Sequence, residues 1–349
     1  MPTDNNNFTW NKYCVGKTEE IKKANSSYEE LDYLIRRAAE AERIKADIQG
    51  TVPISRAAGA TSASTRHVPK KHFMIPDTQV KPGVPLYHLE WIGQYIVDHP
   101  PDRLIMIGDW YDLPSLSSYD RGKRAFEGRR FTADIDAGHR ALELLEKPLE
   151  LRNAALRRSK HALIKIDKHV TWGNHEDRAR RISEDVPELD GLIGVHLFDE
   201  FWQARGWNTH QYTEVVDLDG VWYSHCFLTE LTGRALGAMA STMLKTIGHT
   251  FTQGHRQTYE VAARYVGDKM HRALIAGACY LHDEDYKGPN RKSSERSANY
   301  HWRGCVMKHD VADGEYSLME LPLDYFCRRY EGMSLERFMR KVHPAFPGY

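Results

Sequence analysis

Residues 104–113, LIMIGDWYDL, decide the fold class of this chain. Leu104 to Ile107 form an apolar run that ends at Gly108, and two carboxylates, Asp109 and Asp112, follow three residues apart. A solvated turn needs one aspartate at most, whereas a metal site uses several oxygen ligands. The stretch therefore predicts a buried strand that ends at a polar site whose other ligands come from elsewhere in the chain.

The same pattern of an apolar run followed by polar residues recurs along the chain. Short apolar runs end in polar motifs at HFMIPDTQ, KHVTWGNHED, VWYSHC and TFTQGHRQ. Their shortness and flanking glycines favour strands over helix segments. Amphipathic stretches at 85–101 and 133–160 separate the first strands and predict helices. Alternating strands and helices predict an α/β fold with ligands at the ends of strands.

Composition excludes several classes of protein. The 349 residues are 41% hydrophobic and 28% charged, as in a packed globular chain. The formal net charge is zero, so any nucleic-acid surface must be local. The five cysteines contain no CxxC pair, which argues against a zinc ribbon or a disulfide framework and favours a reducing compartment. No apolar run is long enough for a membrane helix, so we expect no membrane partner and a cytoplasmic location, that of the host if a phage encodes the chain.

Changes in composition along the sequence also divide the chain into regions. We expect an N-terminal helical arm at 1–50, a flexible linker at 51–70, the α/β domain at 71–325, and a C-terminal helix and tail at 326–349. The arm has a loose helix-turn-helix pattern, but Glu29, Glu30 and Asp32 would repel phosphate. A packing arm, or one that joins copies in a homo-oligomer, is therefore favoured over a DNA-binding arm.

The residues that follow the predicted strands form a candidate metal constellation. Carboxylate and amide oxygens together with imidazoles suit divalent ions such as Mn²⁺, Fe²⁺, Zn²⁺ or Mg²⁺. The set is too large for one ion, but two ions that share a carboxylate would use all of it. Its members are Asp77, Gln79, Asp109, Asp112, Asn174, His175, His225, His255 and Gln257.

These motifs, in this order, resemble the calcineurin-like metallophosphoesterase superfamily. PDTQVKPGVP, GDWYDLPSLSSYDRGK and EGRRFTADI resemble more narrowly the phosphoesterases of bacteriophages. The resemblance covers roughly residues 72–325. It implies a four-layer α/β/β/α sandwich, here with an N-terminal helical extension. It also implies two divalent cations and hydrolysis of a phosphate ester by metal-bound hydroxide.

The resemblance also implies a role for each position. Asp77 and Gln79 would bind the first metal, and Asp109 would bridge both metals. His175 would lie over the scissile phosphate as a catalytic residue, oriented by Asp112. The second metal would be bound by Asn174, His225 and His255. Gln257 would complete the first site.

Gln79 and Gln257 stand where the superfamily usually has histidines. An amide oxygen is a harder and weaker donor than imidazole, which favours Mn²⁺ or Mg²⁺ over Zn²⁺ at the first site. We therefore expect two divalent ions, with Mn²⁺ favoured. The alternative is that one of the glutamines is not a ligand and that water takes its place.

Several residues beside the motifs can be interpreted in more than one way. His255 follows a better strand than His249, which we expect at a helix end. Strand alternation points Cys226 to the face opposite His225. Trp110 and Tyr111 would either stack on a base or pack against the sheet.

Basic residues beside the motifs are candidates for substrate contact. They would clamp a phosphodiester backbone, and the alternative is a solvated face. The candidates are Arg121, Arg129, Arg130 and Arg178. With the phage resemblance, they favour a phosphodiesterase or nuclease that acts on DNA or RNA.

Two other functions compete. A phosphomonoesterase or protein Ser/Thr phosphatase is disfavoured, because GDWYDLPS lacks the arginine-glycine pair that follows this motif in those phosphatases. A catalytically silent module that binds nucleic acid or protein would need neither Asp112 nor His175.

Overall fold

The computed structural model describes residues 68–118, 126–229, 232–282 and 301–343. The predicted arm at 1–50 and most of the linker lie outside the described residues. The fold is mixed α/β, as the sequence predicts, and contains two mixed sheets. Among the described residues, no helix is long and apolar enough to cross a membrane.

The first sheet carries the strands that the opening motifs predict. Its strand order is β11-β10-β1-β2-β3-β4. Strands β1 to β4 run parallel, whereas β10 pairs antiparallel with both β1 and β11. The bounds are β1 Lys70–Ile75, β2 Arg103–Met106, β3 Asp167–Thr171, β4 Trp207–His210, β10 Gly304–Ala312 and β11 Glu315–Pro322.

The second sheet lies between β4 and β10 in the chain and has the order β5-β6-β7-β9-β8. Its strands β6, β7 and β9 are parallel, and β5 and β8 close its two edges in antiparallel pairs. The bounds are β5 Val216–Leu218, β6 Val221–Ser224, β7 Phe251–Gln253, β8 Tyr259–Val266 and β9 Lys269–Ala276.

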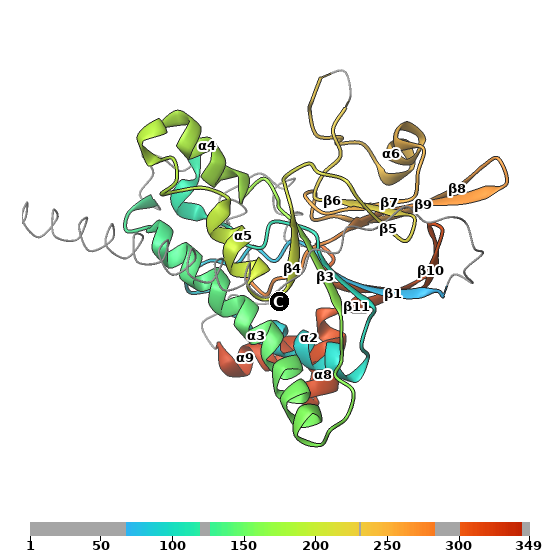
Figure 1. The fold of residues 1–349 in the computed structure, drawn as a ribbon, viewed down its shortest axis with the longest axis horizontal. Coiled ribbons are helices and arrows are strands. Elements are labelled where there is room, and N and C mark those ends of the chain that lie inside the picture. The colour runs from blue at the N-terminus through green and yellow to red at the C-terminus, as the bar shows by residue number, and fades with distance from the viewer. Residues whose placement is uncertain (1–67, 119–125, 230–231, 283–300, 344–349) are drawn as a thin grey trace, which may run out of the picture.

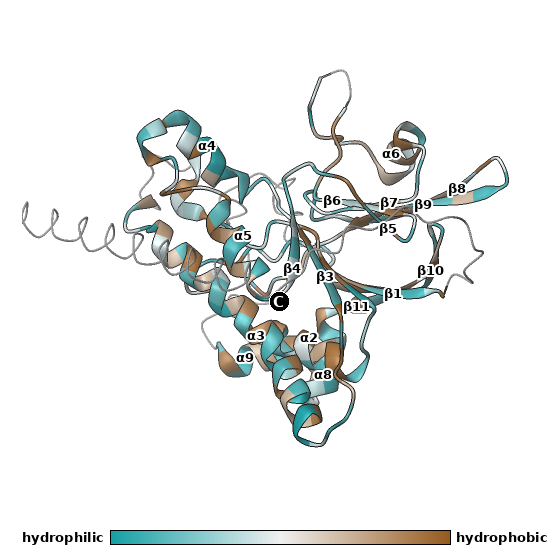
Figure 2. Ribbon diagram, in the orientation of Figure 1, coloured by the Kyte–Doolittle hydropathy of each residue, from teal (hydrophilic) through white to brown (hydrophobic). Residues whose placement is uncertain are grey.

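Helices connect the parallel strands. The predicted stretches at 85–101 and 133–160 form α2 and α3, which cross between β1, β2 and β3. Figure 2 shows hydrophobic residues gathered in the strands and on parts of these helices, whereas α4 is mostly hydrophilic. The bounds are α2 Tyr87–Asp98, α3 Phe131–Arg158, α4 Asp177–Asp185, α5 His196–Gln203, α6 Ala240–Ile247, α8 Leu323–Glu331 and α9 Leu335–Val342.

Three buried clusters hold these elements together. The largest joins the first sheet to α2, α3, α5, α8 and α9, and includes Phe73, Ile92 and Leu142. A second lies between the two sheets, where Met74 of β1 and Leu274 of β9 share one cluster. A third joins α6 to the outer side of the second sheet. Figure 1 shows the two sheets facing each other, with α6 beyond one and α2, α3 and α8 beyond the other.

The C-terminal region differs in detail from the expected division. The expected boundary between residues 325 and 326 falls inside α8, whose Phe326 and Cys327 are fully buried in the largest cluster. The helix at the end of the chain, α9, begins at a serine cap: the Ser334 hydroxyl accepts a hydrogen bond from the Arg337 N–H. Both helices pack as part of the main body.

Candidate metal centre

The strand ends of both sheets meet at one place. Asp77 follows β1, Asp109 follows β2, and Asn174 follows β3. From the second sheet, His225 directly follows β6 and His255 lies two residues after β7. Because β1, β2 and β3 are parallel neighbours, as are β6 and β7, their carboxyl ends point the same way.

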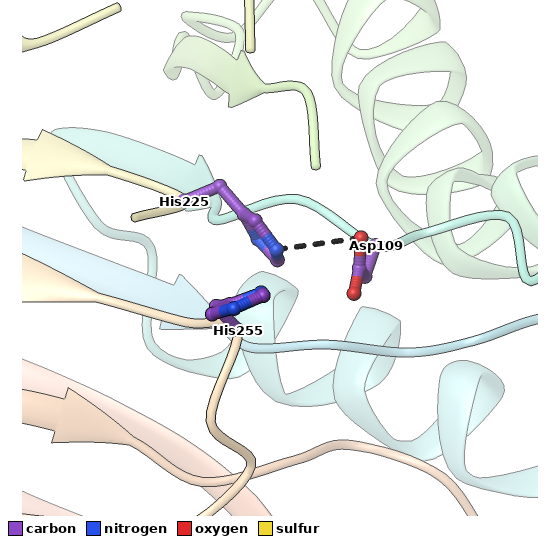
Figure 3. Close-up of side chains that lie close together, drawn as sticks. All are labelled: Asp109, His225 and His255. Atoms are coloured by element: carbon purple, nitrogen blue, oxygen red, sulfur yellow. Dashed lines mark ion pairs between the residues drawn. The ribbon is translucent and has the colours of Figure 1, made fainter. Parts of the chain in front are cut away.

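Asp109 lies at the centre of this cluster. One ligand atom each from Asp109, His225 and His255 lies within 4.8 Å of the others, and Figure 3 shows both imidazoles beside the carboxylate. Asp109 Oδ1 is 3.4 Å from His225 Nε2 and also accepts a hydrogen bond from the His175 N–H. The three side chains form a candidate metal group.

The tautomer of His225 explains why a cation fits there. Its Nδ1 is 2.8 Å from the Ile107 carbonyl oxygen, which can only accept, so Nδ1 carries the proton. Burial lowers the pKa of His225 to about 4, so the ring is neutral and Nε2 has only a lone pair. That lone pair faces Asp109 Oδ1, which is also an acceptor, with no proton between them. A cation would turn this repulsion into coordination.

Asp77 and Gln79 add two unsatisfied oxygens. Asp77 Oδ1 accepts a hydrogen bond from the His255 N–H at 3.2 Å. Asp77 Oδ2 and Gln79 Oε1 are buried, and neither has a hydrogen-bond partner among the described residues. Burial, followed by the charge of Asp109, raises the pKa of Asp77 well above its usual range. Unpartnered buried acceptors are costly unless a ligand or ion completes them, so both fit a divalent cation.

Asn174 and Gln257 complete the predicted set, in different surroundings. Asn174 Oδ1 is 2.7 Å from His255 Nδ1 and 3.1 Å from His225 Nε2. Gln257 Oε1 instead accepts a hydrogen bond from the Tyr280 hydroxyl at 2.9 Å. One lone pair of the Gln257 amide oxygen is therefore already used, unlike that of Gln79.

His175 and Asp112 form a close pair beside the cluster. His175 Nδ1 is 3.0 Å from Asp112 Oδ1 and 2.9 Å from the Asp112 carbonyl oxygen, so this nitrogen carries a proton. His175 Nε2 lies 3.8 Å from Asp109 Oδ2. Burial lowers the pKa of His175, but Asp109 and Asp112 outweigh it and raise the pKa to about 9. The imidazole can therefore hold a second proton on Nε2 near neutral pH.

Two cationic side chains surround Asp112. Arg178 donates from Nη1 to the Asp112 carbonyl oxygen at 2.7 Å. Its Nη2 lies 3.1 Å from His175 Nε2 and can only donate, so this contact is a hydrogen bond while Nε2 is unprotonated, and Arg178 must turn away when Nε2 takes up a proton. Lys81 Nζ is 3.1 Å from Asp112 Oδ2. Lys81 was not among the expected substrate contacts, because a lysine four residues after Asp77 carries no motif of its own.

Arg129 and Arg130, two of the remaining arginine candidates, donate to backbone carbonyl oxygens. Arg129 donates to the Pro114 carbonyl oxygen at 3.1 Å, and Arg130 donates to the carbonyl oxygen of Arg129. Both directly precede α3. Arg121 lies outside the described residues.

Glu176 is a buried site residue that sequence reasoning missed. Its Oε2 accepts hydrogen bonds from the N–H groups of Asp109 and Gly173, and its Oε1 accepts one from Tyr111. Burial, and then the charge of Asp109, raises the pKa of Glu176 to about 7. The carboxylate ties the loop after β2 to the loop after β3. Its only signal in the sequence was its position in the GNHED motif, and the family resemblance assigns no separate role to that position.

Backbone geometry fixes these loops. Gly108 has a φ of 91°, and a Cβ there would lie 2.5 Å from His225 Nδ1. Asp109 itself has a φ of 47°, in the left-handed region that non-glycine residues rarely adopt. His255 shares this conformation, with a φ of 66°. Such strain persists only where the surrounding structure enforces it, which is common at functional sites.

The other sequence interpretations are also resolved. His249 follows α6, so it does lie near a helix end. Cys226 is buried and its thiol donates to the Tyr212 hydroxyl, and it is not part of the candidate metal group of Asp109, His225 and His255. Trp110 and Tyr111 are fully buried, and Trp110 Nε1 donates to the Gly138 carbonyl oxygen, so they pack in the core.

Comparisons with known proteins do not assign the chain to a family. No family model matches, and no curated protein matches. Among solved structures, 47 chains match. One, a crystal structure, is 13% identical over 72% of this chain and 99% of its own, with a TM-score of 0.28. A similarity at this TM-score supports no conclusion about fold or function.

Proposed function

We propose that this chain is a two-metal phosphoesterase of the calcineurin-like type, which hydrolyses phosphodiester bonds in nucleic acid. The observation that carries the proposal is the set of buried acceptors around Asp109. Carboxylate, imidazole and amide groups converge there, the buried oxygens Asp77 Oδ2 and Gln79 Oε1 have no partner among the described residues, and a protonatable histidine stands beside them. We further propose that the two facing sheets and their outer helices form the four-layer α/β/β/α sandwich of that superfamily.

The proposed ligands divide into two groups. Asp77 and Gln79 would hold the first cation. Asp109 would contribute to both, because it lies beside His225 and its charge acts on Asp77. The second cation would be held by Asn174, His225 and His255. Gln257 could still serve the first cation, because an amide oxygen has a second lone pair beyond the one used by Tyr280. Amide oxygens favour Mn²⁺ or Mg²⁺ at that position.

The reaction would use both the cations and the chain's own residues. Two divalent cations, when bound, lower the pKa of a water molecule and withdraw charge from a phosphoryl group. His175 would hold a proton on Nε2 and deliver it to the departing oxygen, or use it to stabilise charge on the phosphoryl group. Asp112 fixes the ring through Nδ1. Arg178, close to His175 Nε2, would bind a phosphoryl oxygen.

The substrate class rests on the positive side chains near the pair. Arg178 and Lys81 are both mostly buried beside Asp112 and offer donors to a phosphate backbone. A phosphomonoester would use the same donors, so this remains the competing substrate. A silent binding module would have no use for the hydrogen bond between His175 and Asp112.

An activity panel tests the proposal. Chelator-treated protein would be supplied with Mn²⁺, Mg²⁺ or Zn²⁺ and offered bis-p-nitrophenyl phosphate, p-nitrophenyl phosphate, and single- and double-stranded DNA. We expect metal-dependent hydrolysis of the diester and of DNA, greatest with Mn²⁺ and lost in Asp109→Asn. Preference for the monoester would overturn the substrate class. No hydrolysis of any substrate by metal-loaded protein would favour the binding module.

A further inference from the structure

One edge of the second sheet is formed by a long strand, β8. It lies next to β9 and pairs with no other described strand. It has eight residues, whereas the edge strands β4 and β5 have four and three. Figure 1 shows the hairpin of β8 and β9 projecting from the rest of the second sheet. A long exposed edge offers a row of backbone groups with which another strand can pair.

This edge lacks the usual protection against pairing. Proteins commonly protect an edge strand with lysine, proline or a bulge. β8 contains neither lysine nor proline, and its pairing with β9 has no register shift. The edge strand β11 ends at Pro322, and its pairing with β10 does shift register. The side chains of Val261, Tyr265 and Val266 are 47%, 66% and 44% exposed. An open edge with exposed apolar side chains indicates a surface that pairs with another chain.

The hydrogen bonds to β9 identify which backbone groups of β8 face outward. The Thr258 carbonyl oxygen accepts a hydrogen bond from the Gly277 N–H at 2.9 Å, in the same register as the pairing of β8 with β9. Bonded residues alternate along an antiparallel pair, so the even-numbered residues of β8 bond to β9. The backbone N–H and C=O groups of Val261, Ala263 and Tyr265 therefore point away from β9.

These outward groups are complementary to those of a second copy of β8. Two β8 strands can pair antiparallel about a two-fold axis that passes beside Ala262. Val261 of one copy then lies opposite Ala263 of the other, and the two residues exchange N–H···O bonds. Tyr259 lies opposite Tyr265 in the same way, which makes an aromatic cross-strand pair on each side of the axis. Such a self-complementary patch is what a two-fold dimer requires.

The charges of β8 favour this register. Glu260 of each copy lies opposite Arg264 of the other, and opposite charges across a strand pair stabilise it. Glu260 is held by Arg256 at 3.1 Å and by the Ala240 N–H at 2.9 Å, and its side chain is still 28% exposed. Arg264 is exposed and forms no ion pair with any described residue. Moving the axis by one residue in either direction would separate the two charges.

We propose that β8 pairs with β8 of a second copy of this chain, which joins the two second sheets into one continuous sheet. The pairing would cover the exposed side chains of Val261 and Tyr265 and give Arg264 a partner. The proposal goes beyond the proposed function, because no residue of β8 is among the proposed metal ligands. It also concerns a different surface from the N-terminal arm.

Light scattering of the full chain over a range of concentrations tests the proposal. We expect a particle of twice the 40.2 kDa mass of one chain. Ala263→Pro should abolish the dimer, because it removes an outward N–H and leaves the bonds to β9 in place. Ala263→Ser keeps that N–H and should remain dimeric. Arg264→Glu should weaken association roughly tenfold or more, because two attractive pairs become repulsive. Arg234→Glu makes the same charge change at another exposed arginine and should not.

Cross-linking tests the register. Ala262→Cys places one thiol of each copy beside the axis, where the Cα atoms of a non-hydrogen-bonded pair are about 4.5 Å apart. Diamide, which takes up the two hydrogens of the thiols, should then link the copies through a disulfide. Val266→Cys lies at a more exposed position but four residues from the axis, and should not cross-link. The wild type, whose described cysteines are buried, should not either.

Three outcomes would overturn the proposal. They are a monomeric wild type, a dimer that survives Ala263→Pro, and equal cross-linking of Ala262→Cys and Val266→Cys. A monomer would mean that another part of this chain covers the edge or that water does, and a surviving dimer would place the interface elsewhere. Circular dichroism verifies that each variant is folded. If Ala263→Pro is not folded, Arg264→Glu and the two cysteine variants decide.

Discussion

The carboxylate of Asp109 lies beside His225 of the second group of proposed ligands, and its charge helps to raise the pKa of Asp77 in the first group. It is 3.4 Å from His225 Nε2, and its other oxygen is 3.8 Å from His175 Nε2. Asp109→Asn should therefore abolish binding of both cations, because the amide keeps one oxygen but loses the charge that two ions share. Metal analysis after dialysis checks this, with the exposed Asp268→Asn as control. Full metal occupancy in Asp109→Asn would contradict the bridging role.

His175 provides a prediction about the chemical step. His175→Ala should lower turnover of DNA by roughly 10² to 10⁴, the usual contribution of one general acid, with metal binding nearly intact. If His175 protonates the leaving group, the loss should be much smaller for an aryl phosphodiester, which departs without a proton. Asp112→Asn should give a weaker version of the same pattern, because Asp112 only orients the ring. Steady-state kinetics with both substrates measures this, and equal small losses would argue against any catalytic role.

The two glutamines should differ when replaced. Gln79→His should shift metal preference towards Zn²⁺, because imidazole is the softer and stronger ligand and Gln79 Oε1 has no described partner. Gln257→His should have the smaller effect, since Tyr280 already binds that amide. Titration of the apoprotein with Mn²⁺ and Zn²⁺ measures both. Unchanged affinities in Gln79→His would mean that Gln79 is not a ligand.

Among the elements, the loops after β2 and β3 depend on Glu176. Glu176→Gln keeps the shape of the side chain but replaces one acceptor oxygen with an amide donor. Depending on which oxygen is replaced, either the N–H of Tyr111 or the N–H groups of Asp109 and Gly173 lose their acceptor. Leaving a buried donor without a partner lowers the free energy of unfolding by about 1–3 kcal/mol. Thermal unfolding should show a lower Tm, and metal affinity should fall because Asp109 moves. The same substitution at the exposed Glu188, Glu188→Gln, is the matched control. An unchanged Tm and metal affinity in Glu176→Gln would mean that Glu176 does not hold the two loops together.

The strand ends were predictable from sequence, but the contacts between distant loops were not. Apolar runs that stop at Asp77 or Asp109 carry a local signal, because a buried strand and its polar end are adjacent in the chain. Glu176 and Tyr280 act through partners 67 and 23 residues away, respectively, which no local pattern encodes. The helix α8, by contrast, does carry a local signal, because its buried residues Leu323, Phe326 and Cys327 recur at helical spacing.

In the molecule as a whole, the two sheets enclose a buried lysine. Lys308 of β10 is fully buried between the sheets, and its Nζ donates to the hydroxyls of Tyr223, at 3.1 Å, and Thr252. The same Nζ also lies 4.5 Å from the centres of the Tyr223 and Tyr316 rings. No carboxylate among the described residues forms an ion pair with it. Burial therefore lowers the pKa of Lys308 well below its usual value of 10.5.

This lowered pKa links stability to pH in a defined direction. Between the lowered pKa and 10.5, the folded chain holds Lys308 neutral while the unfolded chain holds it protonated. Unfolding takes up a proton, so the free energy of unfolding rises with pH by up to about 1.4 kcal/mol per pH unit from this group. Lys308→Met removes that dependence and should stabilise the protein near neutral pH, because no charge or proton is then lost on burial.

Denaturant unfolding of the wild type and of Lys308→Met across the alkaline range tests the linkage. The stability gained by Lys308→Met should be largest at the lowest pH studied and should shrink as pH rises towards 10.5, because the unfolded wild type then no longer takes up the proton. Lys269→Met is the matched control: this partly exposed lysine begins β9. Its difference from wild type should not vary with pH below about 9, since an exposed lysine titrates alike in both states. Parallel curves for wild type and Lys308→Met would mean that the lysine stays protonated between the sheets, with the two hydroxyls and two rings offsetting the loss of water around its charge.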